Sequence, residues 1–258
     1  MKFYLDFDGV IAHSAIECIN SAYAVWLKKN SNLYKNIDLA EKLYLKSKII
    51  NCSIANRYLV VPPENYYCLI DAVFHEIAFG KSNLTSKSIH DLFVSKLKSI
   101  SDQELNEFKH NFFLYRDKKF DSLSDSDWVL ENPPTSFICA FYELIKDYDV
   151  QISVVSRKNY KAIEKWFKGA NLSINKIYGN EVLSSFKNNK FLLIEDIQRN
   201  SGNQKGIFID DFVSEFDSLG WQDINIITLP AGWGYNDLKD NTKQTLNIIK
   251  EYMDDLSN

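Results

Sequence analysis

Residues 3–10 read Phe-Tyr-Leu-Asp-Phe-Asp-Gly-Val, an apolar run that ends in two carboxylates two residues apart. Side chains alternate along a strand, so Asp6 and Asp8 can share a side of its C-terminal end. Gly9 would let the backbone turn sharply behind them. Two acids that converge there can hold a divalent cation and divide nucleophilic and acid/base duties. An Asp-rich turn has the same composition, so this stretch alone leaves both interpretations open.

Two later apolar runs predict strands that also end in polar side chains. Residues 150–155 lead into Ser156, and residues 206–209 lead into the pair Asp210 and Asp211. Ligands of an open α/β sheet bind in the crevice outside the carboxyl ends of the strands. We therefore expect the hydroxyl and both acid pairs to gather at one edge of a sheet.

A lysine in an unfavourable place completes this set. The pattern over residues 188–194 predicts a helix with Lys190 in its first turn, where the helix dipole disfavours a cation. A nearby anion would explain that position. The alternatives are a solvated surface lysine, or a role filled instead by Lys187 or Lys205. The apolar stripe that directly follows Lys190 favours Lys190.

The residues between the first acid pair and the 150–155 strand have helical periodicity. Ser14 with Glu17 forms a capping-box pattern, and apolar stripes at helical spacing follow it. Two prolines at 133–134 mark the exit, because proline cannot lie within a helix. The expected fold class is α/β: a Rossmann-like parallel sheet core with helices on both faces, plus an inserted all-helical cap domain. The expected boundaries are 1–13 and 132–258 for the core and 14–131 for the cap.

The order acid pair, hydroxyl, lysine, acid pair resembles that of the haloacid dehalogenase-like (HAD) hydrolases. After the strand predicted at 224–229, residues 231–235 read Ala-Gly-Trp-Gly-Tyr. This segment resembles the Gly-aromatic-Gly-aromatic loop of phosphoglycolate-phosphatase-like members. The resemblance covers about residues 1–30 and 130–258, and within the family the helical insertion would be a C1-type cap.

The resemblance implies a Mg²⁺-dependent phosphatase that hydrolyses a small phosphate monoester through an aspartyl-phosphate intermediate. Asp6 would be the nucleophile, and Asp8 would protonate the leaving oxygen and then activate water. Asp211 would be the main further metal ligand beside Asp6, and the backbone carbonyl of Asp8 would complete the protein's share of the shell. Asp210 would bind the metal or orient a ligand.

The resemblance also implies groups that bind the substrate. Ser156 would hydrogen-bond the transferring phosphoryl group, and Lys190 would offset its charge and steady Asp6. A helix N-cap is the alternative for Ser156. Arg157 and Lys158 are candidate substrate contacts or an exposed loop pair. Arg116, in the aromatic-rich part of the cap, is a candidate for substrate selection or for structural stacking on an aromatic ring.

Several reactions share this framework. A dehalogenase lacks the second acid, so Asp8 argues against it, and a phosphonatase needs a cap lysine that the sequence does not place. A sugar phosphomutase would keep the same catalytic residues and stays open, as does a non-catalytic binding or regulatory protein that retains the fold. Sugar phosphates, phosphoglycolate and nucleoside monophosphates are the expected substrates, in that order.

Composition restricts the partners and the compartment. A net charge of -4 argues against binding to nucleic acid, which rests on clustered Lys and Arg. No window approaches a membrane span, and the chain opens on a strand rather than a signal peptide. The four cysteines suggest no disulfide framework. We expect a cytoplasmic enzyme whose partner is a small phosphorylated metabolite, with no nucleic acid and no membrane involved.

Overall fold

The computed structural model describes residues 1–35, 37–60, 62–79, 85–217, 220–236 and 238–257. The chain divides into two compact units. Met1–Ser14 and Leu123–Asn258 form the first, which we call the core unit. Ala15–Ser122 forms the second, which we call the helical unit.

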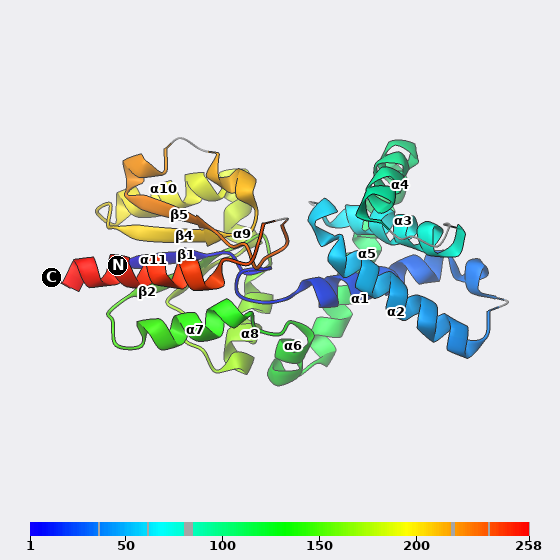
Figure 1. Ribbon diagram of the computed structural model, residues 1–258, viewed down its shortest axis with the longest axis horizontal. Coiled ribbons are helices and arrows are strands. Elements are labelled where there is room, and N and C mark those ends of the chain that lie inside the picture. The colour runs from blue at the N-terminus through cyan, green and yellow to red at the C-terminus, as the bar shows by residue number, and fades with distance from the viewer. Residues whose placement is uncertain (36, 61, 80–84, 218–219, 237, 258) are drawn as a thin grey trace. The chain divides into compact units, whose positions relative to one another are not determined.

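The core unit is built on one parallel sheet, shown in Figure 1. Its described strands are β1 (Lys2–Leu5), β2 (Gln151–Val155), β3 (Lys176–Tyr178), β4 (Gly206–Asp210) and β5 (Ile226–Pro230). They lie in the spatial order β3-β2-β1-β4-β5, and every neighbouring pair is parallel. β2 and β3 lie on one side of β1, and β4 and β5 lie on the other. The strand order therefore reverses at β1. Ligand sites of such sheets lie outside the carboxyl ends of the strands at that point.

Helices cover both faces of this sheet. Phe3 on one face of β1 meets Phe141 of α7 (Ser136–Ile145) edge to face, with ring centroids 4.9 Å apart. Tyr4 on the other face packs in an apolar cluster with Leu193 and Ile194 of α10 (Lys190–Asn200). Figure 1 shows α10 and α7 on opposite sides of the sheet. The predicted parallel sheet with helices on both faces is confirmed.

The other described α-helices of the core unit lie between the strands in the chain or follow the last strand. They are α6 (Asp125–Glu131), α8 (Tyr160–Ala170), α9 (Asn180–Leu183) and α11 (Thr242–Ser257). β1 and β4 are buried along their whole length, as expected for central strands of a parallel sheet covered on both faces.

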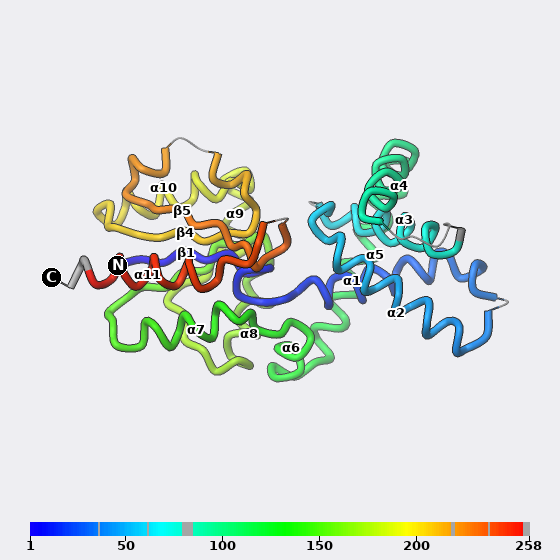
Figure 2. The backbone as a smooth tube through the Cα atoms, in the orientation of Figure 1, coloured from blue at the N-terminus to red at the C-terminus, as the bar shows by residue number. Residues whose placement is uncertain are grey.

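The helical unit is inserted between β1 and β2, as the sequence predicts. Its helices are α1 (Ala15–Lys29), α2 (Leu39–Ala55), α3 (Tyr66–Phe79), α4 (Ser86–Ser99) and α5 (Asp102–Ser122), traced in Figure 2. Aromatic side chains form much of its interior. Trp26 packs against Phe74 and Tyr34 at centroid distances of 5.1 and 6.4 Å. No helix in the described part of the chain combines the length and apolar character that crossing a membrane requires.

The segment that contains α6 belongs to the core unit, although the sequence places residues up to 131 in the cap. The buried Trp128 of α6 donates a hydrogen bond from Nε1 to the backbone oxygen of Ala162 in α8, at 2.9 Å. Gly169 of α8 lets the backbones approach, since a Cβ there would lie 2.1 Å from the backbone oxygen of Asp125. The compact core unit therefore resumes at Leu123 and includes α6. The functional division into a catalytic core and a cap stays a prediction.

Candidate active site

Three carboxylates from two neighbouring strand ends lie together at the C-terminal edge of the sheet. Asp6 follows β1, Asp210 ends β4, and Asp211 follows Asp210. One carboxylate oxygen from each lies within 4.8 Å of the others, and all three residues are buried. The strands align because β1 pairs with β4 in parallel register, and the Asp6 N–H donates to the Ile209 backbone oxygen at 2.9 Å. We call this group the acidic triad.

The Lys190 ammonium lies between two acids of the triad. Its Nζ is 2.6 Å from Asp210 Oδ2 and 3.0 Å from Asp6 Oδ1, and the side chain is 1% exposed. Lys190 is the first residue of α10, and Asn189 caps that helix. Burial alone would lower the pKa of Lys190, but the carboxylates of Asp210 and Asp6 raise it above its usual value. The structure therefore supplies the anion expected beside a lysine in a first helical turn.

The triad carries more negative charge than Lys190 offsets. Burial raises the pKa of Asp210 above its usual range, as do the charges of Asp6 and Asp211, while Lys190 opposes this shift. Although Asp6 Oδ1 lies close to Lys190, it receives no well-directed hydrogen bond from the described residues. Buried carboxylate oxygens in excess of their cations fit a hard divalent ion such as Mg²⁺. The triad could hold a metal ion.

The loop after β5 holds Asp211 in place. The Tyr235 N–H donates to Asp211 Oδ2 at 2.7 Å, and the Asn236 side-chain amide donates to the Asp211 backbone oxygen at 3.0 Å. Two glycines make room for this carboxylate. A Cβ at Gly234 would lie 2.2 Å from Asp211 Cβ, and one at Gly9, whose φ is +83°, would lie 2.3 Å from Asp211 Oδ2. The Asp211 carboxylate is therefore fixed from both sides.

If the acidic triad holds Mg²⁺, replacing Gly9 with Ala should weaken its binding by about 10- to 100-fold, because the added methyl must displace Asp211 Oδ2. Calorimetric titration with Mg²⁺ measures this loss. Gly202→Ala is the matched control, because Gly202 also has a positive φ, of +81°, but a Cβ there meets nothing within 4 Å. If both variants bind Mg²⁺ as tightly as the unmodified protein, close packing at Gly9 does not position a metal ligand.

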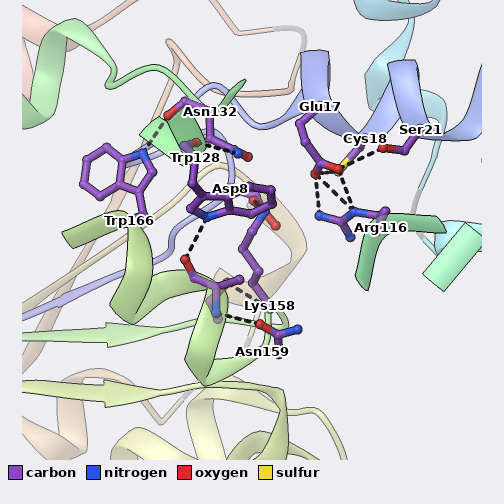
Figure 3. A network of polar contacts seen from close by, with 12 residues as sticks. Asp8, Glu17, Cys18, Ser21, Arg116, Trp128, Asn132, Lys158, Asn159 and Trp166 are labelled. Atoms are coloured by element: carbon purple, nitrogen blue, oxygen red, sulfur yellow. Dashed lines mark hydrogen bonds and ion pairs between the residues drawn. The ribbon is translucent and has the colours of Figure 1, made fainter. Parts of the chain in front are cut away.

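Asp8 is not part of the triad and has a different partner. Its Oδ1 accepts a hydrogen bond from Lys158 Nζ at 2.9 Å, as Figure 3 shows. The sequence pattern favours Lys158 only as a substrate contact or an exposed loop residue, yet its side chain is 4% exposed. Lys158 follows Ser156 by two residues, which is the one signal in the sequence that places it near the same sheet edge.

Ser156 lies directly after β2, and its side chain is buried. Its Oγ accepts a hydrogen bond from the Lys158 N–H at 3.3 Å. Asn159 is the N-cap of α8, and its Oδ1 accepts from the Ala162 N–H at 2.8 Å. The alternative role of Ser156 as the cap of the following helix is therefore wrong. β2 pairs with β1 in parallel register, so the hydroxyl lies at the same edge of the sheet as the triad.

Arg157 turns toward the chain that follows β4. Its guanidinium forms an ion pair with Glu215 and donates to the Asn188 backbone oxygen at 3.2 Å. The Glu215 side chain is thus paired with Arg157. A role of Arg157 in substrate binding stays a prediction.

Comparison with known proteins identifies this architecture. No protein-family model and no curated protein matches the sequence. The solved structure of a candidate phosphoglycolate phosphatase from Lactobacillus delbrueckii subsp. bulgaricus matches with a TM-score of 0.50 and 12% identity, over 96% of each chain. The structure of a predicted phosphoglycolate phosphatase from Haemophilus somnus 129pt matches with a TM-score of 0.50 and 12% identity, over 97% of this chain and 96% of its own. The structure of a candidate haloacid dehalogenase-like hydrolase from Bacteroides fragilis matches with a TM-score of 0.50 and 13% identity, over 91% of this chain and 89% of its own.

The chain has the HAD-like hydrolase fold. At these identities the likeness shows the fold, which agrees with the family resemblance of the sequence. In this HAD-like core, the four groups that carry the resemblance all follow strands or open a helix at one edge of the sheet. They are Asp6 and Asp8 after β1, Ser156 after β2, Lys190 at the start of α10, and Asp210 and Asp211 at the end of β4.

Arg116, the candidate for substrate selection, has a partner within the helical unit. Its Nε donates to Glu17 Oε1 at 3.0 Å, and a terminal amino group donates to Glu17 Oε2 at 2.6 Å. Glu17 is fully buried and also accepts from Ser21 Oγ at 2.9 Å. The pair, drawn in Figure 3, joins α5 to α1. Its contribution to substrate selection stays a prediction.

Replacing Arg116 with Met should reduce the free energy of unfolding by about 3–5 kcal/mol, because Glu17 is left as a buried carboxylate without its cation. Urea unfolding, followed by tryptophan fluorescence, measures the change. The double variant Glu17→Met/Arg116→Met should recover much of the loss, since it removes both charges. An Arg116→Met variant as stable as the unmodified protein would mean that the pair does not hold α1 to α5.

Proposed function

We propose that this protein is a Mg²⁺-dependent phosphatase that hydrolyses a small phosphate monoester through an aspartyl-phosphate. The observation that carries the proposal is the buried triad of Asp6, Asp210 and Asp211 with Lys190 at the carboxyl edge of a HAD-like sheet. A phosphate monoester is a dianion that repels a carboxylate nucleophile, so cations must offset this charge before attack. Lys190 supplies one of them.

Asp6 is the proposed nucleophile. A carboxylate oxygen of Asp6 forms a bond to phosphorus while the bond from phosphorus to the ester oxygen breaks, which leaves an aspartyl-phosphate. Lys190, 3.0 Å from Asp6 Oδ1, orients this carboxylate and faces the charge of the phosphoryl group. Ser156 donates its hydroxyl proton to a phosphoryl oxygen, and Arg157 at the rim is the proposed contact for the rest of the substrate.

Asp8 is the proposed acid and base. It gives a proton to the departing ester oxygen, and it then takes a proton from the water that attacks the aspartyl-phosphate. Its side chain is 32% exposed, whereas that of Asp6 is 10% exposed. The greater exposure suits a group that exchanges protons with both a leaving group and water.

Asp6, Asp210 and Asp211 are the proposed side-chain ligands of Mg²⁺, with the Asp8 backbone carbonyl as a further ligand. The bound ion would neutralise the carboxylates and polarise the phosphoryl group. Asp210 already accepts hydrogen bonds from Lys190 and from the Phe212 N–H at 2.8 Å. Its main proposed role is therefore to orient Lys190, while Asp211 is the more direct ligand.

The proposed substrate is a small phosphorylated metabolite, with sugar phosphates first. Phosphoglycolate comes next, supported by the names of two structural neighbours, and nucleoside monophosphates follow. The test is phosphate release from p-nitrophenyl phosphate and from a panel of these compounds, with Mg²⁺ or with EDTA. We expect turnover that needs Mg²⁺ and disappears on EDTA treatment. Release no faster than that of an Asp6→Asn preparation, for every compound, would refute the proposal.

A further inference from the structure

Lys158 lies in a cage of aromatic side chains beside Asp8. Its Nζ is 5.2 Å from the ring centroid of Phe7 and 5.8 Å from that of Trp128. The same Nζ donates to Asp8 Oδ1 at 2.9 Å, and Figure 3 shows the lysine extended toward this carboxylate with the Trp128 ring alongside. We call Phe7 and Trp128 the lysine cage.

The lysine cage is fixed from behind by α8. Trp128 donates from Nε1 to the Ala162 backbone oxygen at 2.9 Å. Phe7 is fully buried and packs edge to face on Trp166 of α8, with centroids 5.5 Å apart. Trp166 in turn donates from Nε1 to the Asn132 backbone oxygen at 2.6 Å. Both walls of the cage are therefore held by hydrogen bonds or close ring packing.

The backbone of Lys158 is fixed as well. Its N–H donates to Ser156 Oγ at 3.3 Å, and its carbonyl oxygen accepts from the Asn180 N–H at 2.9 Å. Gly179 permits this close approach, because a Cβ there would lie 3.0 Å from the Lys158 carbonyl oxygen. The backbone of Lys158 is thus held in place next to the end of β2.

A buried ammonium is costly unless it is compensated, and Asp8 with two aromatic faces supplies the compensation. A residue in an exposed ion pair holds its partner weakly, because both side chains move freely. A caged lysine has lost that freedom, so it can fix the orientation of a more exposed partner. An ammonium has three donors and no acceptor, so it pairs with Asp8 as a hydrogen-bond acceptor. That is the form in which Asp8 takes up a proton.

We propose, on the basis of the function proposed above, that Lys158 is the positioning residue that orients Asp8 as the base of the second half-reaction. In that step the oxygen of a water molecule bonds to phosphorus, the bond between phosphorus and the Asp6 oxygen breaks, and Asp8 takes a proton from the water. Inorganic phosphate leaves and the Asp6 carboxylate is restored. Trp128 and Phe7 act on this step through Lys158.

The test separates the two half-reactions. The first needs little acid catalysis with p-nitrophenyl phosphate, whose leaving group is itself acidic. In rapid mixing with Mg²⁺, Lys158→Met should therefore release about one nitrophenolate per enzyme quickly. Steady turnover should follow at a rate about 100-fold below that of the unmodified protein, because a misplaced base slows hydrolysis of the aspartyl-phosphate. Lys158→Arg, which keeps the cation, should recover part of this rate.

Met occupies a similar volume between the aromatic rings, and Asp8 can be hydrated, so the variant should fold. Thermal unfolding checks this, and Lys158→Gln is the second neutral variant should the Met variant not fold. Lys168→Met is the matched control, because Lys168 on α8 also pairs with a carboxylate, that of Glu164, at 3.1 Å but is 60% exposed. It should leave both phases unchanged.

Three results would overturn the positioning role: full turnover of Lys158→Met, lost turnover without a rapid first phase, or weaker inhibition by inorganic phosphate. The last would mean that the lysine binds the phosphoryl group directly. Asp6→Asn, run in parallel, separates this from a failure of the proposed function. If Asp6→Asn is inactive and Lys158→Met is fully active, only the positioning role of Lys158 is refuted. If Asp6→Asn is active, both the positioning role and the proposed function are refuted.

Discussion

Replacing Asp6 with Asn should lower the turnover of p-nitrophenyl phosphate by about 10⁴-fold or more. An amide is a poor nucleophile and cannot form the acyl phosphate, so the first half-reaction fails. The change preserves the size of a buried side chain at the end of β1. It also leaves Lys190 paired with Asp210 at 2.6 Å, so the protein should stay folded. Steady-state kinetics with saturating Mg²⁺ measures the effect.

Asp223→Asn is the control for this experiment, because Asp223 is an exposed acid of the core unit that lies in the connection before β5. It should turn over substrate like the unmodified protein. If Asp6→Asn kept more than about a tenth of the activity, with the fold intact, Asp6 would not be the nucleophile.

Replacing Lys190 with Met should abolish turnover and also reduce the free energy of unfolding by about 3–5 kcal/mol in the absence of Mg²⁺. The substitution leaves the buried carboxylates of Asp6 and Asp210 facing each other without the ammonium that lies 3.0 and 2.6 Å from them. A divalent cation that binds only the folded state stabilises it. Mg²⁺ should therefore restore part of the lost stability while activity stays low. Urea unfolding with and without Mg²⁺ measures both effects.

Lys205→Met is the control for Lys190 and removes one of the two lysines that the sequence offers as alternatives. Lys205 directly precedes β4 and so lies at the opposite edge of the sheet from the triad. Its ammonium lies 5.8 Å from the Tyr252 ring. The variant should keep its activity and most of its stability. A Lys190→Met variant as stable as the Lys205→Met variant would show that Lys190 does not balance the buried acids.

The sequence predicts the parts of the site that depend on local patterns. An apolar run that ends in acids identifies Asp6 and Asp210 at strand ends, since strands and the residues that terminate them are encoded locally. Lys190 is predicted because a cation in a first helical turn requires an anion, and the structure brings Asp6 and Asp210 to it. Parallel pairing then places these groups at one edge, as the fold class implies.

Contacts between residues far apart in the chain could not be predicted in this way. Arg157 and Lys158 are adjacent in the chain, yet Lys158 packs against Phe7 and Trp128 and pairs with Asp8, while Arg157 pairs with Glu215. The boundary at Ser122 likewise depends on how α6 packs against α8.

The ion pair inside the helical unit could not be predicted from the sequence for the same reason. Glu17 looks like half of a capping box and Arg116 like a substrate contact, yet they form one buried pair 99 residues apart in the chain. No local pattern carries that information, because each side chain is typical of an exposed helix position.

The proposed mechanism requires that Asp6 carries the phosphoryl group during turnover. The direct measurement is to mix the protein with substrate and Mg²⁺, quench, reduce acyl phosphates with borohydride, and locate the modified residue by peptide mass spectrometry. We expect conversion of Asp6 to homoserine, in an amount that rises in Lys158→Met and vanishes in Asp6→Asn. Modification at another residue, or turnover with no modified Asp6 in either the unmodified protein or Lys158→Met, would contradict it.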